Sequence, residues 1–285
     1  MMTTLQKRLL ITISILTAIM VFISANLFFA FSINPNQLQV RYQTIEDQKV
    51  SKDMGIFSIV YFTDLQYGTF ENDQRLEKLT STIEELDPSV LVFGGDLYDD
   101  QFTPDESSNQ KLIKAFNSIE APLGKFCVLG EKDINDENRS KAVRSIYAAS
   151  GFEILENSSV RLTSQNHSSV RLTGLSTTPD YNILSTNSNE EYNIIVSHYP
   201  DNLMDESLAS ASISLALAGN AHGTQITYPL LGAYKKAEGA TQLNRAKSED
   251  LDFPILLSDG VGCTDVDARL NADPEIHYLL FSGKN

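Results

Sequence analysis

Polar side chains that can bind or surround metal ions follow five separate apolar runs of this sequence. They are Asp64 and Gln66 in FTDLQYG, Asp96 in FGGDLYDD, Glu131, Lys132 and Asp133 in LGEKD, His198 in IIVSHYPD, and Asn220 with His222 in AGNAHGTQ. Carboxylates, amide oxygens and imidazoles gathered in one place form a metal centre, and a carboxylate shared by two cations holds them about 3.5 to 4 Å apart. Asp96 is the best candidate for this shared carboxylate, because Gly94 and Gly95 before it let the backbone approach closely.

These residues need a scaffold that brings distant parts of the chain together, and the hydrophobic pattern predicts one. Short apolar runs alternate with segments whose apolar residues repeat at helical spacing. The expected strands are residues 56–62, 90–95 and 125–130, and the expected helices lie at 76–86, 112–119 and 138–150. Parallel strands place their ligands at their carboxyl ends, so we expect the polar groups at one edge of a sheet.

The second half of the chain has a different pattern, with strands joined by short connections. These strands are expected at residues 152–155, 160–163, 170–175, 193–197, 214–218, 254–258 and 275–281. The whole pattern predicts one α/β domain that contains two mixed sheets.

The order of the five polar blocks resembles that of the calcineurin-like metallophosphoesterases, in particular their membrane-anchored bacterial branch. That family shows Asp-x-His, Gly-Asp-x-x-Asp, Gly-Asn-His-Asp, a His before Pro-Asp, and Gly-His-x-His-Gly-Gly-Gln. This chain has Asp-x-Gln, Gly-Asp-Leu-x-Asp, Gly-Glu-Lys-Asp, His-x-Pro-Asp and Gly-Asn-x-His-Gly-x-Gln. The resemblance covers roughly residues 56–281. It implies a four-layer α/β/β/α sandwich of two mixed sheets with a two-metal site between the sheets.

Matched position by position, the resemblance implies two overlapping sets of metal ligands. The first set is Asp64, Gln66, Asp96 and His222, and the second is Asp96, Glu131, His198 and Asn220. Gln66 and Asn220 stand where the family has histidine, and Glu131 stands where it has asparagine. All three keep an oxygen donor, and this change favours Mn²⁺ or Mg²⁺ over Zn²⁺. We therefore expect up to two divalent cations as cofactors.

Lys132 and Asp133 are the expected catalytic residues. Lys132 stands where the family's histidine gives a proton to the leaving group, but an unperturbed lysine, with a pKa of about 10.4, is a poor acid at neutral pH. Lys132 is therefore a desolvated acid, a fixed charge against a phosphate oxygen, or an ammonium that replaces a lost metal ion. Asp133 is expected to orient its neighbours or to cap a turn. His167 and His277 are expected to be structural.

The N-terminal segment predicts a membrane anchor. Residues 9–31 carry no charge and would extend ~34 Å as a helix, enough to cross a hydrocarbon core of ~30 Å. Lys7 and Arg8 precede this span, so the positive-inside rule places the N-terminus in the cytoplasm and the rest of the chain outside. A signal peptide cleaved near Ile23 to Ala25 is the alternative, and it leaves the domain in the same compartment.

The expected organisation has four parts. They are a cytoplasmic N-terminus at 1–8, a transmembrane anchor at 9–31, a polar connector or edge strand taken as a linker at 32–53, and a phosphoesterase domain at 54–285. Cys127 and Cys263 lie in apolar runs and are expected to be buried free thiols.

Charge and motif together leave two classes of function open. The net charge of −15 argues against a nucleic-acid partner, because phosphate backbones need a basic surface. The resemblance implies a membrane-anchored, extracellular phosphoesterase that hydrolyses a phosphate mono- or diester, of a small molecule, a lipid or the cell envelope, with metal-activated hydroxide. The alternative is a degenerate relative that binds a phosphorylated ligand or a protein partner at the cell surface.

Overall fold

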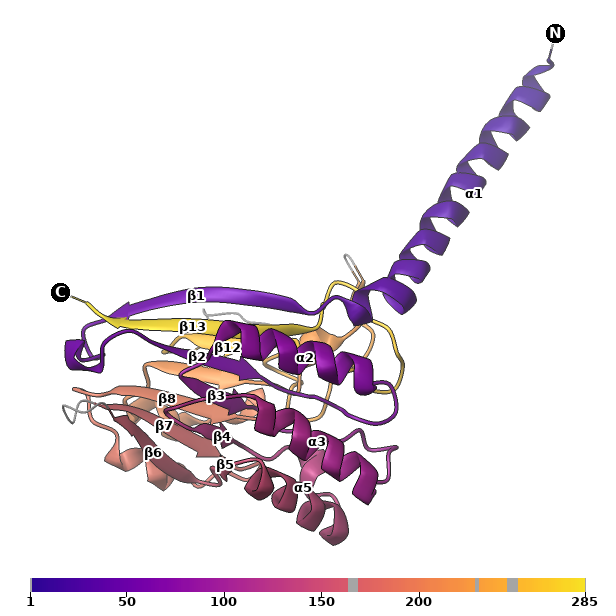
Figure 1. The fold of residues 1–285 in the computed structure, drawn as a ribbon. Coiled ribbons are helices and arrows are strands. Elements are labelled where there is room, and N and C mark those ends of the chain that lie inside the picture. The colour runs from indigo at the N-terminus through magenta and orange to yellow at the C-terminus, as the bar shows by residue number, and fades with distance from the viewer. Residues whose placement is uncertain (1, 164–168, 229–230, 245–250, 285) are drawn as a thin grey trace.

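The computed structural model describes residues 2–163, 169–228, 231–244 and 251–284. Two β-sheets lie face to face, α-helices cover the outer face of one sheet, and a long N-terminal helix projects from the domain (Figure 1). His167 lies outside the described residues, and the expectation for it stays a prediction.

The first sheet has the strand order β1-β13-β2-β3-β4-β5. Strands β2 to β5 are parallel, β13 is antiparallel to β2, and β1 is parallel to β13. The strands span Gln39–Asp47 (β1), Phe57–Phe62 (β2), Val90–Phe93 (β3), Lys125–Cys127 (β4), Phe152–Ile154 (β5) and Glu275–Gly283 (β13). Strands β2 and β3 are buried along their whole length, which explains their continuous apolar sequences.

Helices connect the parallel strands and cover the outer face of the first sheet. They are α2 (Asp73–Leu86), α3 (Glu106–Ser118), the single turn α4 (Glu131–Ile134) and α5 (Glu137–Ala149). Asn72, Asp105 and Asp136 cap α2, α3 and α5 by accepting hydrogen bonds from backbone N–H groups of the first turn. Apolar side chains such as Leu79 and Phe116 pack these helices against the sheet.

The second sheet has the strand order β12-β9-β8-β7-β6, parallel except for β6. Its strands span Ser158–Thr163 (β6), Ser169–Leu175 (β7), Tyr192–Ser197 (β8), Leu215–Ala218 (β9) and Ile255–Leu257 (β12). A core that includes Ile59, Val92, Ile194 and Leu217 fills the space between the two sheets. Cys127 and Cys263 are buried free thiols, which confirms the expectation for both.

The expected layered fold of two mixed sheets is confirmed. The layer outside the second sheet, however, consists of short 3₁₀ helices and not of α-helices. The outer face of the second sheet is covered by the 3₁₀ helices η4 (Tyr181–Thr186), η5 (Pro200–Met204) and η6 (Glu206–Ser210). Their buried leucines pack on this face. The segments are short and rich in Asp, Asn and Ser, residues that hydrogen-bond nearby backbone and disfavour longer α-helices.

Of the two alternatives for residues 32–53, a connector or an edge strand, the structure shows the edge strand in the central part. Residues Gln39–Asp47 form β1, which pairs in register with β13 from Gln39 beside Glu275 to Asp47 beside Gly283. Four consecutive residues of β1 are exposed because this strand lies at the edge of the sheet. An edge position tolerates a polar sequence, so the polar composition did not exclude a strand.

The N-terminal helix α1 (Thr4–Phe28) stands away from the domain and buries none of its residues (Figure 1). It continues into a π-helical turn, Phe29–Ile33, and a 3₁₀ turn, Asn34–Asn36. Within the helical stretch from Thr4 to Asn36, an 18-residue window has a mean hydropathy of 2.2. The length and composition of this stretch fit a membrane span or a signal sequence.

Candidate metal centre

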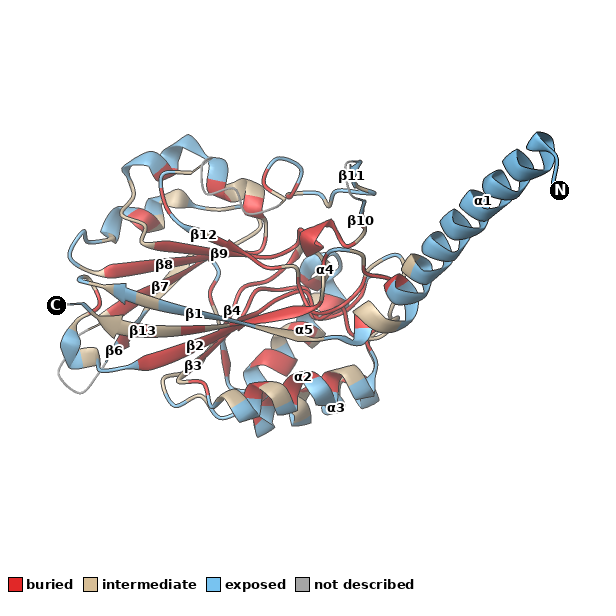
Figure 2. Ribbon diagram, turned by 90° about the horizontal axis from the view of Figure 1, so that it is seen from above, coloured by how far each residue is buried: buried red, intermediate tan, exposed pale blue. Residues whose placement is uncertain are grey.

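The loops at the carboxyl ends of β2, β3 and β9 hold five of the predicted ligands in an unusual backbone conformation. These residues have φ between 49° and 61°, in the left-handed region: Asp64, Gln66, Asp96, Asn220 and His222. A non-glycine residue held there costs about 1–3 kcal/mol, and such residues cluster at functional sites. The chain turns sharply where each strand ends, and the buried loops gather at one end of both sheets (Figure 2).

Two glycines allow these loops to approach each other. A Cβ on Gly130 would lie 2.0 Å from Asp96 Oδ1, and a Cβ on Gly95 would lie 2.9 Å from His198 Nδ1. Gly95 also has a φ of 97°, which side chains rarely adopt. The position of the Asp96 carboxylate therefore depends on glycine in the loops after β3 and β4.

Asp64, Asp96 and His198 form the centre of the site. Each is at most 1% exposed, and one ligand atom from each lies within 4.8 Å of the others. Burial raises the pKa of Asp96 to about 8, and the neighbouring His198 opposes this shift. A buried carboxylate is costly without a counter-charge, so this cluster is suited to a cation.

His198 is held by its backbone partner in the orientation of a metal ligand. Its Nδ1 lies 2.8 Å from the carbonyl oxygen of Gly94, which fixes the proton on Nδ1 in the neutral ring. Its Nε2 lies 2.9 Å from Glu131 Oε2 and 3.5 Å from Asp96 Oδ1. Burial lowers the pKa of His198, but Asp96 and Glu131 outweigh burial and raise it well above its usual value. Three predicted ligands therefore converge on one point.

Asp64 and His222 present ligand atoms that the protein leaves unpaired. Asp64 Oδ2 accepts a hydrogen bond from the Asn220 backbone N–H at 2.9 Å, whereas Oδ1 lies 3.4 Å from His222 Nε2. Within the described residues, neither Asp64 Oδ1 nor His222 Nδ1 makes a hydrogen bond, although both atoms are buried. Burial also lowers the pKa of His222, which keeps the ring neutral and able to bind a cation. A buried oxygen that has no hydrogen bond is available to bind a water molecule or an ion.

Gln66 and Lys132 form a separate network against the other side of Asp96. Lys132 Nζ donates to Gln66 Oε1 at 2.8 Å and to Thr264 Oγ1 at 3.1 Å, and Gln66 Nε2 donates to Asp96 Oδ2 at 2.9 Å. Burial lowers the pKa of Lys132, but the charges of Asp96 and Glu131 outweigh burial and raise it. Its surroundings therefore favour a fixed positive charge over the desolvated acid.

A cavity of about 400 Å³ opens over this network. Its lining includes Glu131, Lys132, His222, Tyr234, Lys235 and Thr264. The side chain of Asn220, which also lines it, donates to the Glu238 carbonyl oxygen. The lining thus combines three predicted ligands with lysines and acidic side chains, next to the buried cluster of Asp64, Asp96 and His198.

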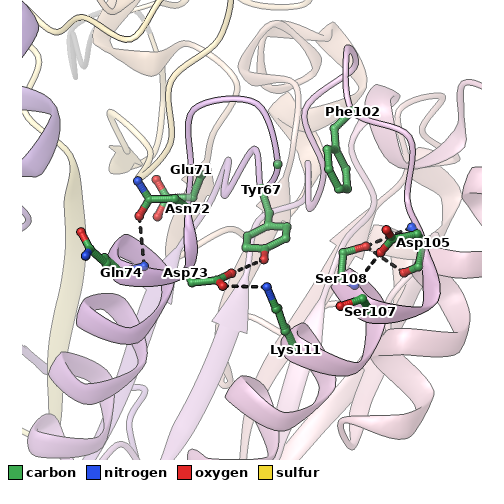
Figure 3. A pocket seen from close by; sticks show the side chains of 11 residues that line it. Tyr67, Glu71, Asn72, Asp73, Gln74, Phe102, Asp105, Ser107, Ser108 and Lys111 are labelled. Carbon is green, nitrogen blue, oxygen red and sulfur yellow. Dashed lines mark hydrogen bonds and ion pairs between the residues drawn. The ribbon is translucent and has the colours of Figure 1, made fainter.

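A second cavity, of about 440 Å³, lies between the first turns of α2 and α3 (Figure 3). There Asp73 accepts hydrogen bonds from Tyr67 Oη and Lys111 Nζ, both at 2.6 Å. Asp73 is thus paired with its neighbours, whereas Glu71 Oε2 is buried and makes no hydrogen bond within the described residues. None of the predicted ligands lines this cavity. The metal centre remains the better candidate for an active site.

Comparison with known proteins decides the family. The model of the calcineurin-like phosphoesterase family matches residues 57–233. The chain belongs to this family. Uncharacterized metallophosphoesterases of Bacillus subtilis (YkuE) and Aquifex aeolicus are each 25% identical to this calcineurin-like phosphoesterase, over 90% and 87% of this chain and 90% and 93% of theirs. The solved structure of the calcineurin-like phosphoesterase YfkN from Bacillus subtilis is 13% identical, covers 80% of this chain and 90% of its own, and has a TM-score of 0.39.

In this calcineurin-like phosphoesterase, Asp133 is a positioning residue and not the catalytic residue we predicted. Its carboxylate is fully buried and accepts hydrogen bonds from the backbone N–H groups of Asp96, Leu97 and Gly130 at 2.8–2.9 Å. With both oxygens turned to the backbone, Asp133 joins the loops after β3 and β4 and presents no atom to a substrate.

The residues present fit the divalent cations that the family uses. Hard oxygen donors from Asp64, Asp96 and Glu131, with imidazole from His198, are suited to Mn²⁺ or Mg²⁺. The unpaired oxygen of Asp64 supports this fit independently of the family. The predicted ligand Gln66 is also buried at the site, but its oxygen faces Lys132.

Sequence reasoning missed two parts of the phosphoesterase site. Thr264, a partner of Lys132, follows the glycine turn after β12, so a sixth strand end could have been searched for polar groups. The small hairpin of β10 (Thr227–Tyr228) and β11 (Gly232–Ala233) lies beside the cavity and was not predicted, because strands of two residues leave no periodic pattern. His277 is buried on β13 and pairs with Glu275 at 3.1 Å, as a structural residue does.

Proposed function

We propose that this protein is a metal-dependent phosphoesterase that hydrolyses a phosphate mono- or diester outside the cytoplasmic membrane. The observation that carries the proposal is the buried cluster of Asp64, Asp96 and His198, with an unpaired Asp64 oxygen, beside a cavity lined by lysines. The proposed ligands are the predicted set, Asp64, Gln66, Asp96, Glu131, His198, Asn220 and His222, for up to two cations. Gln66 would bind a cation only if its amide turned away from Lys132.

The side chains around the cavity divide the work of the reaction. A bound divalent cation supplies a Lewis acid that polarises a phosphoryl oxygen and makes water more acidic. Lys132, kept charged by Asp96 and Glu131, is placed to neutralise a second phosphoryl oxygen. Asp133 and the Gly94 carbonyl hold Asp96 and His198 in place, so the polar groups are preorganised before the substrate arrives.

The proposed substrate is a lipid or cell-envelope phosphate at the membrane surface. Hydrogen bonds connect the base of the N-terminal helix to the site, which supports this proposal. The backbone N–H of Arg269 donates to the carbonyl oxygen of Ala30 at 2.9 Å, and the backbone N–H of the next residue, Leu270, donates to the carbonyl oxygen of Gln225 at 2.9 Å. Gln225 in turn bonds Thr264, a partner of Lys132. Helix α1 leaves the domain on the side where α4, β10 and β11 lie (Figure 2). Residues 9–31 are proposed as the membrane anchor, with residues 1–8 in the cytoplasm and the domain outside.

Activity assays with defined metals test the proposal. The purified protein should hydrolyse an activated phosphomonoester or phosphodiester with Mn²⁺ or Mg²⁺, and Zn²⁺ should serve less well. Asp96→Asn should lower metal content and activity together, while His277→Ala should change neither by more than a few-fold. Equal turnover by the unmodified protein and by the Asp96→Asn variant would reject the proposed enzymatic function.

A degenerate, ligand-binding relative is the second candidate, and the Lys132–Gln66–Asp96 network favours it because family histidines are absent there. For this candidate, no divalent cation supports turnover. Restoring the family residues with Gln66→His, Glu131→Asn, Lys132→His and Asn220→His should then produce activity. An inactive parent with an active quadruple variant would establish the degenerate form.

A further inference from the structure

We propose that the ammonium group of Lys132 permanently takes the place of one of the two cations, so that the site binds a single divalent cation at Asp64, Asp96 and His198. The inference rests on the proposed metal dependence, but it does not require turnover. The inference states how many divalent cations the site binds and gives a physical reason for that number.

The orientation of the Gln66 amide is the first step of the argument. An ammonium group only donates hydrogen bonds, so the Gln66 atom 2.8 Å from Lys132 Nζ must be the oxygen. The amide NH₂ then faces Asp96 Oδ2, 2.9 Å away. An NH₂ group cannot bind a cation, and Gln66 is the residue that replaces the histidine of the family's Asp-x-His motif. Gln66 is therefore a partner of Lys132 and Asp96 in this arrangement.

The two oxygens of Asp96 have different surroundings, which argues against a bridge between two cations. Oδ2 faces the Gln66 NH₂ and lies 3.8 Å from the Lys132 ammonium. Oδ1 lies 3.5 Å from His198 Nε2, on the side of the metal ligands, and accepts a hydrogen bond from the Lys132 backbone N–H at 3.1 Å. Both oxygens thus have a fixed donor, but only Oδ1 also lies on the side of the metal ligands.

The Lys132 ammonium is surrounded as a bound cation would be. Its side chain is 13% exposed, and Nζ has oxygen partners in Gln66, Thr264 and Asp96 at 2.8, 3.1 and 3.8 Å. Two of the three N–H donors of the ammonium have hydrogen-bond acceptors, Gln66 and Thr264, and Asp96 provides the opposite charge at 3.8 Å. Thr264 contributes a neutral hydroxyl group to this environment and belongs to neither of the two predicted sets of metal ligands.

The charges of the centre balance with one divalent cation and Lys132. When a cation is bound, His198 is neutral as a ligand and the carboxylates of Asp64, Asp96 and Glu131 are ionised. They then contribute three negative charges, and one divalent cation with one ammonium contributes three positive charges. The fourth carboxylate, Asp133, is satisfied by three backbone N–H groups. A second divalent cation beside Asp96 Oδ2 would lie next to the ammonium, and like charges so close in a buried site repel strongly.

Metal counting on the full chain in detergent tests the inference. Titration with Mn²⁺, followed by calorimetry and by metal analysis after gel filtration, should give one Mn²⁺ per chain, and electron paramagnetic resonance should show an isolated Mn²⁺ spectrum. Lys132→Met, which keeps the length and removes the charge, should bind a second Mn²⁺ at least tenfold more tightly than the parent does. Lys111→Met is the matched control, because Lys111 pairs with Asp73 in the other cavity, and it should still bind one.

Each outcome decides a different claim. Two Mn²⁺ per parent chain, with an exchange-coupled spectrum, would overturn the inference and leave the proposed function intact. One Mn²⁺ per parent chain, without turnover of any tested substrate, would support the inference and reject the proposed enzymatic function. No bound Mn²⁺ would reject both. If Lys132→Met binds no second ion while its circular dichroism matches the parent, the ammonium is not what excludes that ion. If this variant fails to fold, the parent's cation number still decides.

Discussion

Replacing Asp133 with Asn should loosen the two loops that carry the metal ligands. Asp133 Oδ2 accepts from the backbone N–H groups of Asp96 and Gly130, and Oδ1 accepts from that of Leu97. An Asn oxygen can keep only one of these two positions, so its NH₂ faces at least one buried N–H group. That N–H group loses its partner, at a cost of about 1–3 kcal/mol. Burial raises the pKa of Asp133, so removing the charge returns part of this cost.

The net loss should be about 2 kcal/mol in the free energy of unfolding. For a domain of this size, such a loss lowers Tm by about 4–8 °C. Urea unfolding of Asp133→Asn and of Asp100→Asn, followed by circular dichroism, measures it, because Asp100 is an exposed aspartate of the same loop region. The Mn²⁺ content should fall in Asp133→Asn and stay unchanged in Asp100→Asn. If both variants unfold within about 0.5 kcal/mol of each other, the carboxylate does not organise the loops.

Three further predictions use other parts of the structure. Burial raises the pKa of Glu275, but hydrogen bonds from His277 and Arg41 outweigh burial and lower the pKa to about 2. Ionised Glu275 therefore stabilises the fold at pH values above its ordinary pKa of 4.5, and this stability is lost as the pH falls toward 2. Glu275→Gln should therefore lose roughly 2–3 kcal/mol at pH 7 and show a flatter decline in its urea midpoint below pH 4.5; parallel acid limbs for the two proteins would contradict this. Gly130→Ala puts a methyl group 2.0 Å from Asp96 Oδ1 and should weaken Mn²⁺ binding at least tenfold, whereas Gly151→Ala, which has open space around it, should bind Mn²⁺ as the parent does. A reporter enzyme fused to the C-terminus should be active only in a form that works outside the cytoplasm, and a cytoplasmic signal would end the proposed topology.

The central strands and most site residues could be predicted from sequence for one physical reason. A strand buried on both faces must be apolar throughout, so 56–62 and 90–95 were visible, and the polar residue after each run had to mark a strand end. Asp64, Asp96 and His198 were placed together in this way, and the structure brings their ligand atoms within 4.8 Å.

What the sequence could not provide were features that depend on neighbours far along the chain. The orientation of the Gln66 amide cannot be predicted from its own position in the sequence. It depends on a hydrogen bond from Lys132, which lies 66 residues later, in α4. Strand β1 has no apolar face to reveal it, since an edge strand needs only a partner for its backbone. The sequence left a catalytic, an orienting or a capping role open for Asp133, and the positions of three backbone N–H groups favour the orienting role.

The pairing of β1 with β13 also constrains when this protein can fold. Gln39 sits beside Glu275, so the first sheet joins the two ends of the chain and cannot be completed until nearly all of the chain has been synthesised. Closing so long a loop is slow, and until then the backbone edges of β1 and β2 remain open to other chains. If the domain crosses a membrane, it must cross unfolded and complete its sheet afterwards on the far side. We therefore expect a chain truncated before residue 275 to aggregate more readily than the full chain.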